Sequence, residues 1–303
     1  MKNVLLVEKC VGETPLECLN RFRAAHPEYA EVPMTYAGRL DPMANGLLLV
    51  LAGDLVHRKD DFLGLDKEYR ATVVFGVSTD TYDGLGKIQD TNIPPSPKAT
   101  KGRGKNQTEG SKTDAYEGEM HFFAGIPEGW LRPTGSEKNA LARSKAGSAE
   151  DMEKILESFV GTFEQCYPPY SSKTIDGVQM HQLARNGELD GKDIPKRMVT
   201  VYGVDGVETA AISRSEIAAD LIDRIGRVTG DFRQDAIRAA WQAWQAEDPN
   251  RMMSVVSFRT AVSSGTYIRS IVHELGKRLG VGAVLWKLTR VRIGDFILEN
   301  KDF

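Results

Sequence analysis

The sequence predicts an α+β protein in which one sheet-centred domain spans residues 1–303 and carries insertions. Strand-like apolar runs occur from one end of the chain to the other, and segments with the apolar spacing of helices separate them. A stretch from about residue 91 to residue 147 is instead rich in Pro, Gly, Ser, Thr, Lys and Asn, which predicts a flexible insertion. With 303 residues, 41% of them hydrophobic, the chain can bury a core of ordinary size.

The first part of the chain predicts a strand, a helix and a second strand. Residues 3–8 form a short apolar run, and a helix start follows at TPLE, where Thr14 caps, Pro15 suits the first helical position and Glu17 completes a capping box. We expect this helix to end at about His26. After Pro33 the segment MTYAGRLDPMAN reads as a loop, and GLLLVLAG after it reads as a buried strand, so the loop should leave from the edge of a sheet.

The middle of the chain continues the pattern of strands and helices. Residues 67–77, KEYRATVVFGV, alternate with period two and predict a strand, and the turn-rich TDTYDGLGK follows. After the flexible insertion, residues 148–160 carry apolar side chains at helical spacing, with Gly161 as the expected stop. Two further helices, at about 215–227 and 234–245, predict a helical insertion at about 213–249.

The last part of the chain predicts a strand at MMSVVSFRTAV, a helix and two short closing strands. The helix at 267–279 places Ile268, Ile271, Val272, Leu275 and Leu279 on its inner side. Trp241 and Trp244 lie three residues apart on a predicted helix, a spacing more typical of core residues than of a surface for stacking nucleic-acid bases.

Composition limits the classes of protein to which this chain can belong. No run approaches the roughly 20 apolar residues that cross a bilayer, and the N-terminal apolar run is too short for a signal peptide, so we expect a cytoplasmic protein. Cys10, Cys18 and Cys166 show no metal-ligand spacing and predict free thiols, no disulfides and no metal site. A formal net charge of −3 weakly disfavours nucleic-acid binding, although binding needs only one basic face.

Three residues are candidates for chemistry. Asp41 in GRLDPMANG stands before a proline in a glycine-flanked loop, and its simplest interpretation is a turn residue that caps backbone N–H groups. Tyr69 at the start of a strand is more often a packing residue. Arg269, in the first turn of the last helix, is a cation at the end where the helix dipole disfavours one, so it needs an anionic partner.

Four separated segments resemble, in order, the motifs of the TruB-type tRNA pseudouridine synthases. They are YAGRLDPMANGLLLVLAG, KEYRATVVFGVSTDTYDGLGK, QCYPPYSSKTIDGVQMHQLARNGE and VSSGTYIRSIVHELGKRLGVGAVLWKLTRVRIGDF, about a third of the chain. The resemblance implies a mixed, mainly antiparallel sheet surrounded by helices. It also implies an isomerase that turns a uridine of tRNA, U55 of the T loop, into pseudouridine without a cofactor. No phosphate loop, dinucleotide fingerprint or metal-ligand cluster in the sequence points to other chemistry.

The resemblance also implies roles for individual residues. Asp41 is the essential carboxylate, acting at C1′ of the ribose either as a nucleophile or as the base that starts an elimination. Arg269 pairs with Asp41 and fixes its direction, which leads us to expect the two side chains within salt-bridge distance in one cleft. Tyr69 stacks on the flipped uracil and helps to remove the proton from C5. The residues expected to bind the substrate are Tyr36, Arg39, Tyr170 and Leu288.

Departures from the family pattern keep other functions open. Tyr36 stands where the bacterial tRNA enzymes commonly have a histidine, and Gly38 to Asp41 resemble the GRLD of sibling synthases that act on ribosomal RNA. The alternatives are therefore a synthase for another RNA, such as rRNA, and an RNA-binding or RNA-folding module with weak catalysis. No obligate protein partner is evident from the sequence.

The basic residues predict where RNA could be held. The chain stops seven residues after Phe296, so we expect no C-terminal RNA-binding domain. Phosphate contacts would then come from three clusters, each of which could equally be a solvated surface. The clusters are Lys98, Lys101, Arg103 and Lys105 in the flexible insertion; Lys192, Lys196 and Arg197 in a loop; and Lys277, Arg278, Lys287, Arg290 and Arg292 near the end.

Overall fold

A nine-stranded sheet forms the centre of the molecule in the computed structural model, which describes residues 3–90 and 149–298. The strand order is β1-β3-β12-β4-β11-β10-β7, with β2 also paired to β3 and β13 to β12. All pairings in this sheet are antiparallel except that of β12 with β3. The predicted α+β class with a mixed, mainly antiparallel sheet is confirmed. The strands of this sheet are β1 (Val4–Lys9), β2 (Met34–Ala37), β3 (Asn45–Ala52), β4 (Lys67–Phe75), β7 (Gly161–Cys166), β10 (Lys196–Ser213), β11 (Met252–Val262), β12 (Ala283–Ile293) and β13 (Phe296–Ile297).

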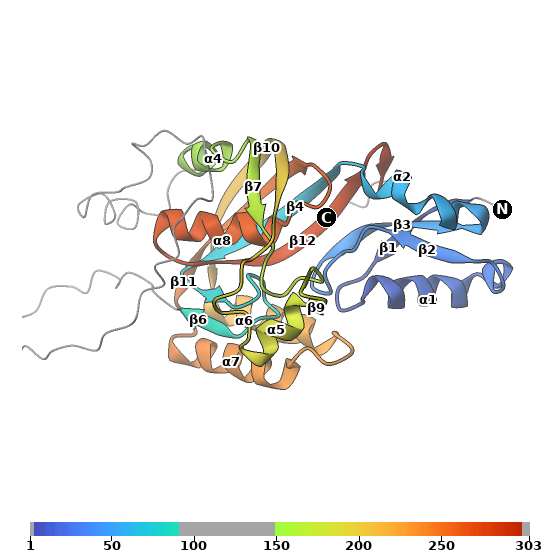
Figure 1. Ribbon diagram of the computed structural model, residues 1–303. Coiled ribbons are helices and arrows are strands. Elements are labelled where there is room, and N and C mark those ends of the chain that lie inside the picture. The colour runs from blue at the N-terminus through green and yellow to red at the C-terminus, as the bar shows by residue number, and fades with distance from the viewer. Residues whose placement is uncertain (1–2, 91–148, 299–303) are drawn as a thin grey trace, which may run out of the picture.

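Helices cover both faces of this sheet (Figure 1). On one face, α4 and α8 pack against β4, β11 and β12, and on the opposite face α6 and α7 pack against the same strands. The α-helices are α1 (Pro15–Ala25), α2 (Lys59–Leu63), α4 (Ala149–Glu157), α5 (Met180–Asn186), α6 (Arg214–Gly226), α7 (Gln234–Glu247) and α8 (Ile268–Leu279). Two 3-10 turns, η1 (Pro27–Tyr29) and η2 (Gly53–Arg58), and two small hairpins, β5 (Ser78–Thr79) with β6 (Ile88–Asp90) and β8 (Thr174–Ile175) with β9 (Val178–Gln179), complete the described elements.

Local sequence signals account well for α1 and β4. The Thr14 side chain accepts a hydrogen bond from the Glu17 amide, and Glu17 reaches back to the Thr14 amide, so the predicted capping box is present. In β4 the alternation places Tyr69 and Val73 in the core shared with α8, while Val74 faces α6 and α7. Both elements form because the pattern of their own residues matches the period of the structure.

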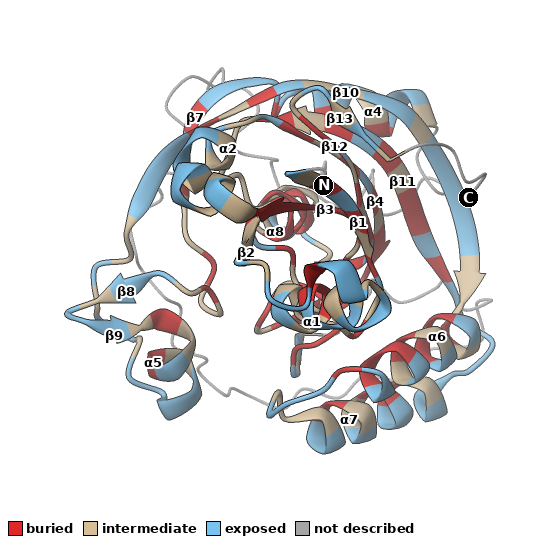
Figure 2. Cartoon of the chain, turned by 90° about the vertical axis from the view of Figure 1, so that its right-hand side faces the viewer, coloured by how far each residue is buried: buried red, intermediate tan, exposed pale blue. Residues whose placement is uncertain are grey.

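Burial follows the same layers (Figure 2). The central strands β4, β11 and β12 are largely buried, whereas long stretches of β10 are exposed. Trp241 and Trp244 of α7 are 0% and 2% exposed, so their prediction as core residues is confirmed. The two tryptophan rings meet edge to face, with centroids 5.3 Å apart, and join α7 to the sheet.

Three predictions about strands are wrong. Residues 34–37 form β2 instead of a loop, and β12 is an 11-residue strand at the centre of the sheet instead of a short closing strand. Lys196 and Arg197, expected in a loop, lie at the start of the 18-residue strand β10. Glycines and bulges interrupt the alternation of apolar and polar residues in β10, and both faces of β12 are buried. Neither strand therefore shows the period-two pattern of a half-exposed strand.

The loop after β2 runs from β2, which pairs only with β3 among the described strands, to β3, which lies inside the sheet. Residues 46–51 of β3 pair with β1 along one side. The other side of β3 pairs with β2 at residues 49–52 and with β12 at residues 45–46. The sheet therefore forks at β3, and residues 38–44 lie at the fork between β2 and β12.

The structure forms α6 and α7 inside the range 213–249, where a helical insertion is predicted. The predicted flexible insertion at 91–147 lies outside the described residues, together with its Lys98, Lys101, Arg103 and Lys105. Cys10, Cys18 and Cys166 are free thiols, as predicted. No helix within residues 3–90 and 149–298 combines the length and apolar character that a bilayer crossing requires.

Candidate active site

A cleft of about 800 Å³ opens at the fork of the sheet. Its wall includes residues from β2 and the loop before β3, from β4 and β12, from the segment after β7, from the connector between α6 and α7, and from the start of α8. All seven side chains singled out from the sequence lie along this cleft, although they come from five separate parts of the chain. They are Asp41, Tyr69, Arg269, Tyr36, Arg39, Tyr170 and Leu288.

Asp41 lies in a loop that the rest of the fold holds firmly. The Ala44 amide donates a hydrogen bond of 3.0 Å to the Asp41 carbonyl, and Gly38 allows the chain to turn with φ 89°. The buried ammonium of Lys9 donates to the carbonyls of Ala44, at 2.6 Å, and Pro42, at 3.4 Å. Burial lowers the pKa of Lys9 to about 8. The carboxylate of Asp41 remains 35% exposed and can meet a ligand in the cleft.

Arg269 holds the Asp41 carboxylate from the first turn of α8. Arg269 Nε donates to Asp41 Oδ2 at 2.7 Å and Nη2 donates to Oδ1 at 3.4 Å, which confirms the predicted proximity across 228 residues of chain. Nη1 donates to the Thr81 carbonyl at 2.8 Å. Two nitrogens on one carboxylate fix its orientation as well as its position.

A second carboxylate, Asp83, lies on the same guanidinium and was missed by the sequence analysis. Its Oδ2 is 3.7 Å from Arg269 Nε, while its Oδ1 accepts from the Thr81 hydroxyl at 2.7 Å and the Leu85 amide at 3.0 Å. Burial raises the pKa of Asp83. Burial also lowers the pKa of Arg269, but Asp41 and Asp83 more than offset this and raise it. The Arg269 guanidinium thus forms ion pairs with two carboxylates, of which only Asp41 is substantially exposed.

The turn segment TDTYDGLGK contained the only sequence signal for Asp83. In that segment Asp83 looks like one more turn residue, because aspartate is common in turns. Its proximity to Arg269 depends on the approach of α8 to the loop after β5, which no local pattern encodes.

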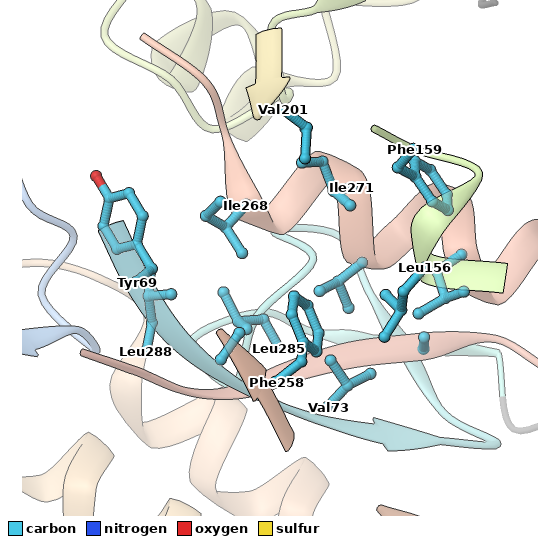
Figure 3. Packing of buried hydrophobic residues seen from close by; sticks show 14 of the residues in the cluster. Tyr69, Val73, Leu156, Phe159, Val201, Phe258, Ile268, Ile271, Leu285 and Leu288 are labelled. Atoms are coloured by element: carbon cyan, nitrogen blue, oxygen red, sulfur yellow. The ribbon is translucent and has the colours of Figure 1, made fainter. Parts of the chain in front are cut away.

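Tyr69 and Leu288 form an apolar surface at the edge of the main core (Figure 3). They come from the adjacent strands β4 and β12, and Ile268 at the start of α8 lies beside them. The Tyr69 ring packs against the core, and its hydroxyl points away from the packed side chains. A flat ring at the wall of a cleft is the type of surface on which a nucleobase stacks.

The other predicted binding residues surround this centre. Tyr36 on β2 lies under the ammonium of Lys59, which is 5.3 Å from the ring centroid. The backbone carbonyl of Arg39 accepts a hydrogen bond of 2.9 Å from Arg290 Nη1. The Tyr170 hydroxyl donates to Asp80 Oδ2 at 3.0 Å, and burial raises the pKa of this phenol.

Several further residues line the cleft without having been predicted as site residues, among them Lys67, Arg233, Tyr267 and Arg290, the last of which was named only as a candidate phosphate contact. Lys67 is buried and donates to the carbonyl of Leu63 at 2.8 Å and to the Ser264 hydroxyl at 3.2 Å. Burial lowers the pKa of Lys67 to about 8. Burial and the nearby Asp41 raise the pKa of Tyr267. Single buried cations in a strand carry no sequence signal of their own, because the same residues are common on surfaces.

The predicted basic clusters divide between the cleft and the surface. Arg197 and Arg290 line the cleft, whereas Lys192 pairs with Asp176 at 3.5 Å and Lys196 with Glu164 at 3.3 Å. In the part of the chain that the structure describes, no group of three or more His, Cys, Asp or Glu side chains could hold a metal ion.

Comparison with known proteins identifies relatives over most of the chain. The family model described as TruB family pseudouridylate synthase (N terminal domain) matches residues 30–117 and 107–220. The tRNA pseudouridine synthase B of Aquifex aeolicus is 25% identical over 300 residues, which are 99% of this chain and 71% of that protein. The protein of the same name from Bifidobacterium longum is 28% identical over 98% of this chain and 64% of its own length. One chain of a crystal structure of a Cbf5-Nop10-Gar1 complex aligns with 98% of this chain at 18% identity and a TM-score of 0.46, and the alignment covers 50% of that chain.

Proposed function

Because this chain belongs to the TruB family of pseudouridylate synthases, we propose that it isomerises a uridine of tRNA, U55 of the T loop, to pseudouridine. The observation that carries the proposal is the Asp41 carboxylate, held by Arg269 at 2.7 Å and exposed to a cleft beside Tyr69. The relatives named tRNA pseudouridine synthase B support tRNA as the substrate. The proposal includes the cytoplasmic location expected from the sequence, and it requires no cofactor and no protein partner.

The cleft has the size and the lining for a nucleotide turned out of its RNA. A volume of about 800 Å³ lies in the range of small-molecule sites. Turning a base out of its stack costs a few kcal/mol, which a new stacking surface can offset. Tyr69 and Leu288 supply that surface next to the Asp41 carboxylate, with Tyr36, Arg39 and Tyr170 as further binding residues around it.

The reaction needs no redox change and no group donor. The bond from C1′ to N1 breaks, the uracil turns in the site, and C1′ joins C5; the proton leaves C5 and N1 ends with a proton, so atoms and electrons balance. Asp41 begins this sequence, either by attacking C1′ or by removing a ribose proton so that uracil leaves by elimination. Arg269 orients Asp41 and stabilises its charge, and the Tyr69 hydroxyl assists the removal of the C5 proton.

The test measures release of tritium from RNA labelled at C5 of uridine. The wild-type protein should release tritium from a T-arm stem-loop that contains U55, and the same stem-loop with cytidine at this position should release none. Asp41→Asn should form no product and bind the stem-loop with nearly the same affinity, because phosphate contacts and stacking supply the affinity. Activity of Asp41→Asn within tenfold of the wild type, about 1.4 kcal/mol of barrier, would remove Asp41 as the reacting group.

Other substrates give distinct outcomes in the same assay. Release from rRNA fragments but not from the T arm would assign the chain to the ribosomal alternative raised by Tyr36 and the GRLD sequence. Tight RNA binding with no release from any RNA would instead favour an RNA-binding or RNA-folding module.

A further inference from the structure

The connector between α6 and α7, residues 227–233, joins three parts of the cleft wall. At its end, Arg233 contacts Asp80 and Tyr170. Arg185 of α5 forms a salt bridge of 3.1 Å with Asp231 in the connector. On the side of α1, the Thr229 hydroxyl donates a hydrogen bond to Glu17. The connector thus belongs to a helical pair far from Asp41 in sequence, yet its Asp231, Phe232 and Arg233 line the same cleft.

The contacts of Arg233 form a compact network at this wall. Arg233 Nη1 donates to Asp80 Oδ2 at 2.8 Å and to the Tyr170 hydroxyl at 2.9 Å, and Nη2 donates to Asp80 Oδ1 at 3.3 Å. The guanidinium also lies over the Tyr170 ring, 4.6 Å from its centroid. The side chains of Arg233 and Asp80 are only 20% and 15% exposed, so solvent screens this ion pair less than a surface pair.

The backbone of Arg233 adopts a conformation that needs compensating contacts. Its φ of 64° and ψ of 27° are left-handed, a region that disfavours residues with a Cβ atom. A non-glycine residue stays in such a conformation when its surroundings compensate for the cost. The two hydrogen bonds to Asp80 and the contact with the Tyr170 ring are favourable interactions that can offset this cost.

We propose that Arg233 is a positioning residue: it holds Tyr170 in the cleft wall, where Tyr170 contacts the RNA substrate. The inference rests on the proposed function and adds to it a role for the helical insertion. Two guanidinium nitrogens of Arg233 already bind a carboxylate, so the residue is not placed as a ligand for phosphate. Instead it fixes both the hydroxyl and the ring of Tyr170, and a binding surface that is ordered before the ligand arrives has less entropy to lose.

The experiment measures affinity for the T-arm stem-loop in an Asp41→Asn background, where no turnover occurs. Arg233→Ala and Arg233→Gly should each weaken binding by about tenfold, or 1.4 kcal/mol. Glycine relieves the left-handed backbone and alanine does not, so equal losses assign the effect to the guanidinium. Arg233→Lys keeps the charge without the planar fork and should restore only part of the affinity. The control is Arg227→Ala, which removes the same charge from the same connector at a site paired with Asp223 in α6, and it should bind within twofold of the parent.

Salt dependence separates positioning from direct phosphate contact. An arginine that binds phosphate releases counterions, so its loss would reduce the slope of log affinity against log salt by about 0.7 to 0.9. Arg233→Ala should instead lower affinity with the slope unchanged. Tyr170→Ala should then cost little more in an Arg233→Ala protein, because the two side chains act as one unit. A reduced slope, or fully additive losses, would overturn the proposal.

The activity of the wild-type protein, which keeps Asp41, distinguishes failure of this inference from failure of the proposed function. Product formed by the wild type together with unchanged affinity of Arg233→Ala and Arg233→Gly would refute the role of Arg233 and leave the function standing. RNA binding without product would refute the function, while the affinity comparison would still decide the role of Arg233. No binding of the stem-loop by the parent protein would overturn both. In the active protein, Arg233→Ala should raise KM and leave kcat at saturating RNA unchanged.

Discussion

Replacing Arg269 by methionine should damage the fold as well as the reaction. Methionine fills similar space with an apolar side chain, so the main loss is the positive charge between Asp41 and Asp83 and the hydrogen bond to the Thr81 carbonyl. Asp83 would then be a buried carboxylate without its cation, with only 10% of its side chain exposed.

The expected cost follows from the burial of this group. Removing one partner of a buried ion pair costs about 3–5 kcal/mol because the other charge stays buried and unpaired. That is a large share of the roughly 5–15 kcal/mol by which a native protein is stable. Adding Asp83→Asn should recover much of the loss, since asparagine keeps an oxygen for the Thr81 hydroxyl and the Leu85 amide but carries no charge. Activity should stay absent in the double variant, because Asp41 has still lost Arg269.

The pH dependence has a defined sign. Burial raises the pKa of Asp83 above its value in the unfolded chain, so the stability that this group contributes is present at low pH and is lost as the pH rises through the folded-state pKa. Without Arg269 this pKa should rise further. The destabilisation caused by Arg269→Met should therefore be larger at pH 8 than at pH 5.

Urea unfolding followed by circular dichroism at the two pH values measures these free energies. If Arg269→Met lowers the free energy of unfolding by less than about 1 kcal/mol at pH 8, the ion pairs of Arg269 contribute no more than solvent-exposed pairs do. The argument from burial of Asp83 would then be wrong. Failure of Asp83→Asn to recover stability would show that the cost does not come from the unpaired carboxylate.

Three further changes test other parts of the structure. Tyr69→Phe should keep RNA affinity and lower kcat by roughly 100-fold, because proton transfer by a positioned group accelerates a reaction by about 10²–10⁴-fold. An unchanged rate in single-turnover assays would show that the Tyr69 hydroxyl takes no part in proton transfer. Trp241→Phe removes the indole N–H that donates to a buried carbonyl at 2.9 Å and should cost about 1–3 kcal/mol in urea unfolding, more than Trp244→Phe. Gly46→Ala should destabilise the protein by more than Gly53→Ala, because both have positive φ but only at Gly46 would a Cβ lie 2.4 Å from the Arg290 carbonyl; equal melting temperatures would contradict this.

Local patterns in the sequence predict the elements whose own residues carry a complete signal. The capping box of α1, the alternation of β4 and the apolar side of α8 depend on neighbours within a few residues, so local patterns predict them. The need of Arg269 for an anionic partner also follows locally, from the dipole of its own helix. The identity of that partner came from the resemblance to a family and not from any pattern in the residues.

Long-range packing brings together the distant residues that share the cleft. β12 joins β3 and β4 in the middle of the sheet, and this pairing places residues 38–44 at a fork between β2 and β12. Asp83 reaches Arg269, and Arg233 reaches Tyr170, through contacts that join elements far apart in the chain. Such contacts form because burial and hydrogen bonding of the whole fold favour them, while each residue alone has the sequence signature of a turn or a surface. Local sequence specifies the conformation of a segment, whereas packing specifies its neighbours.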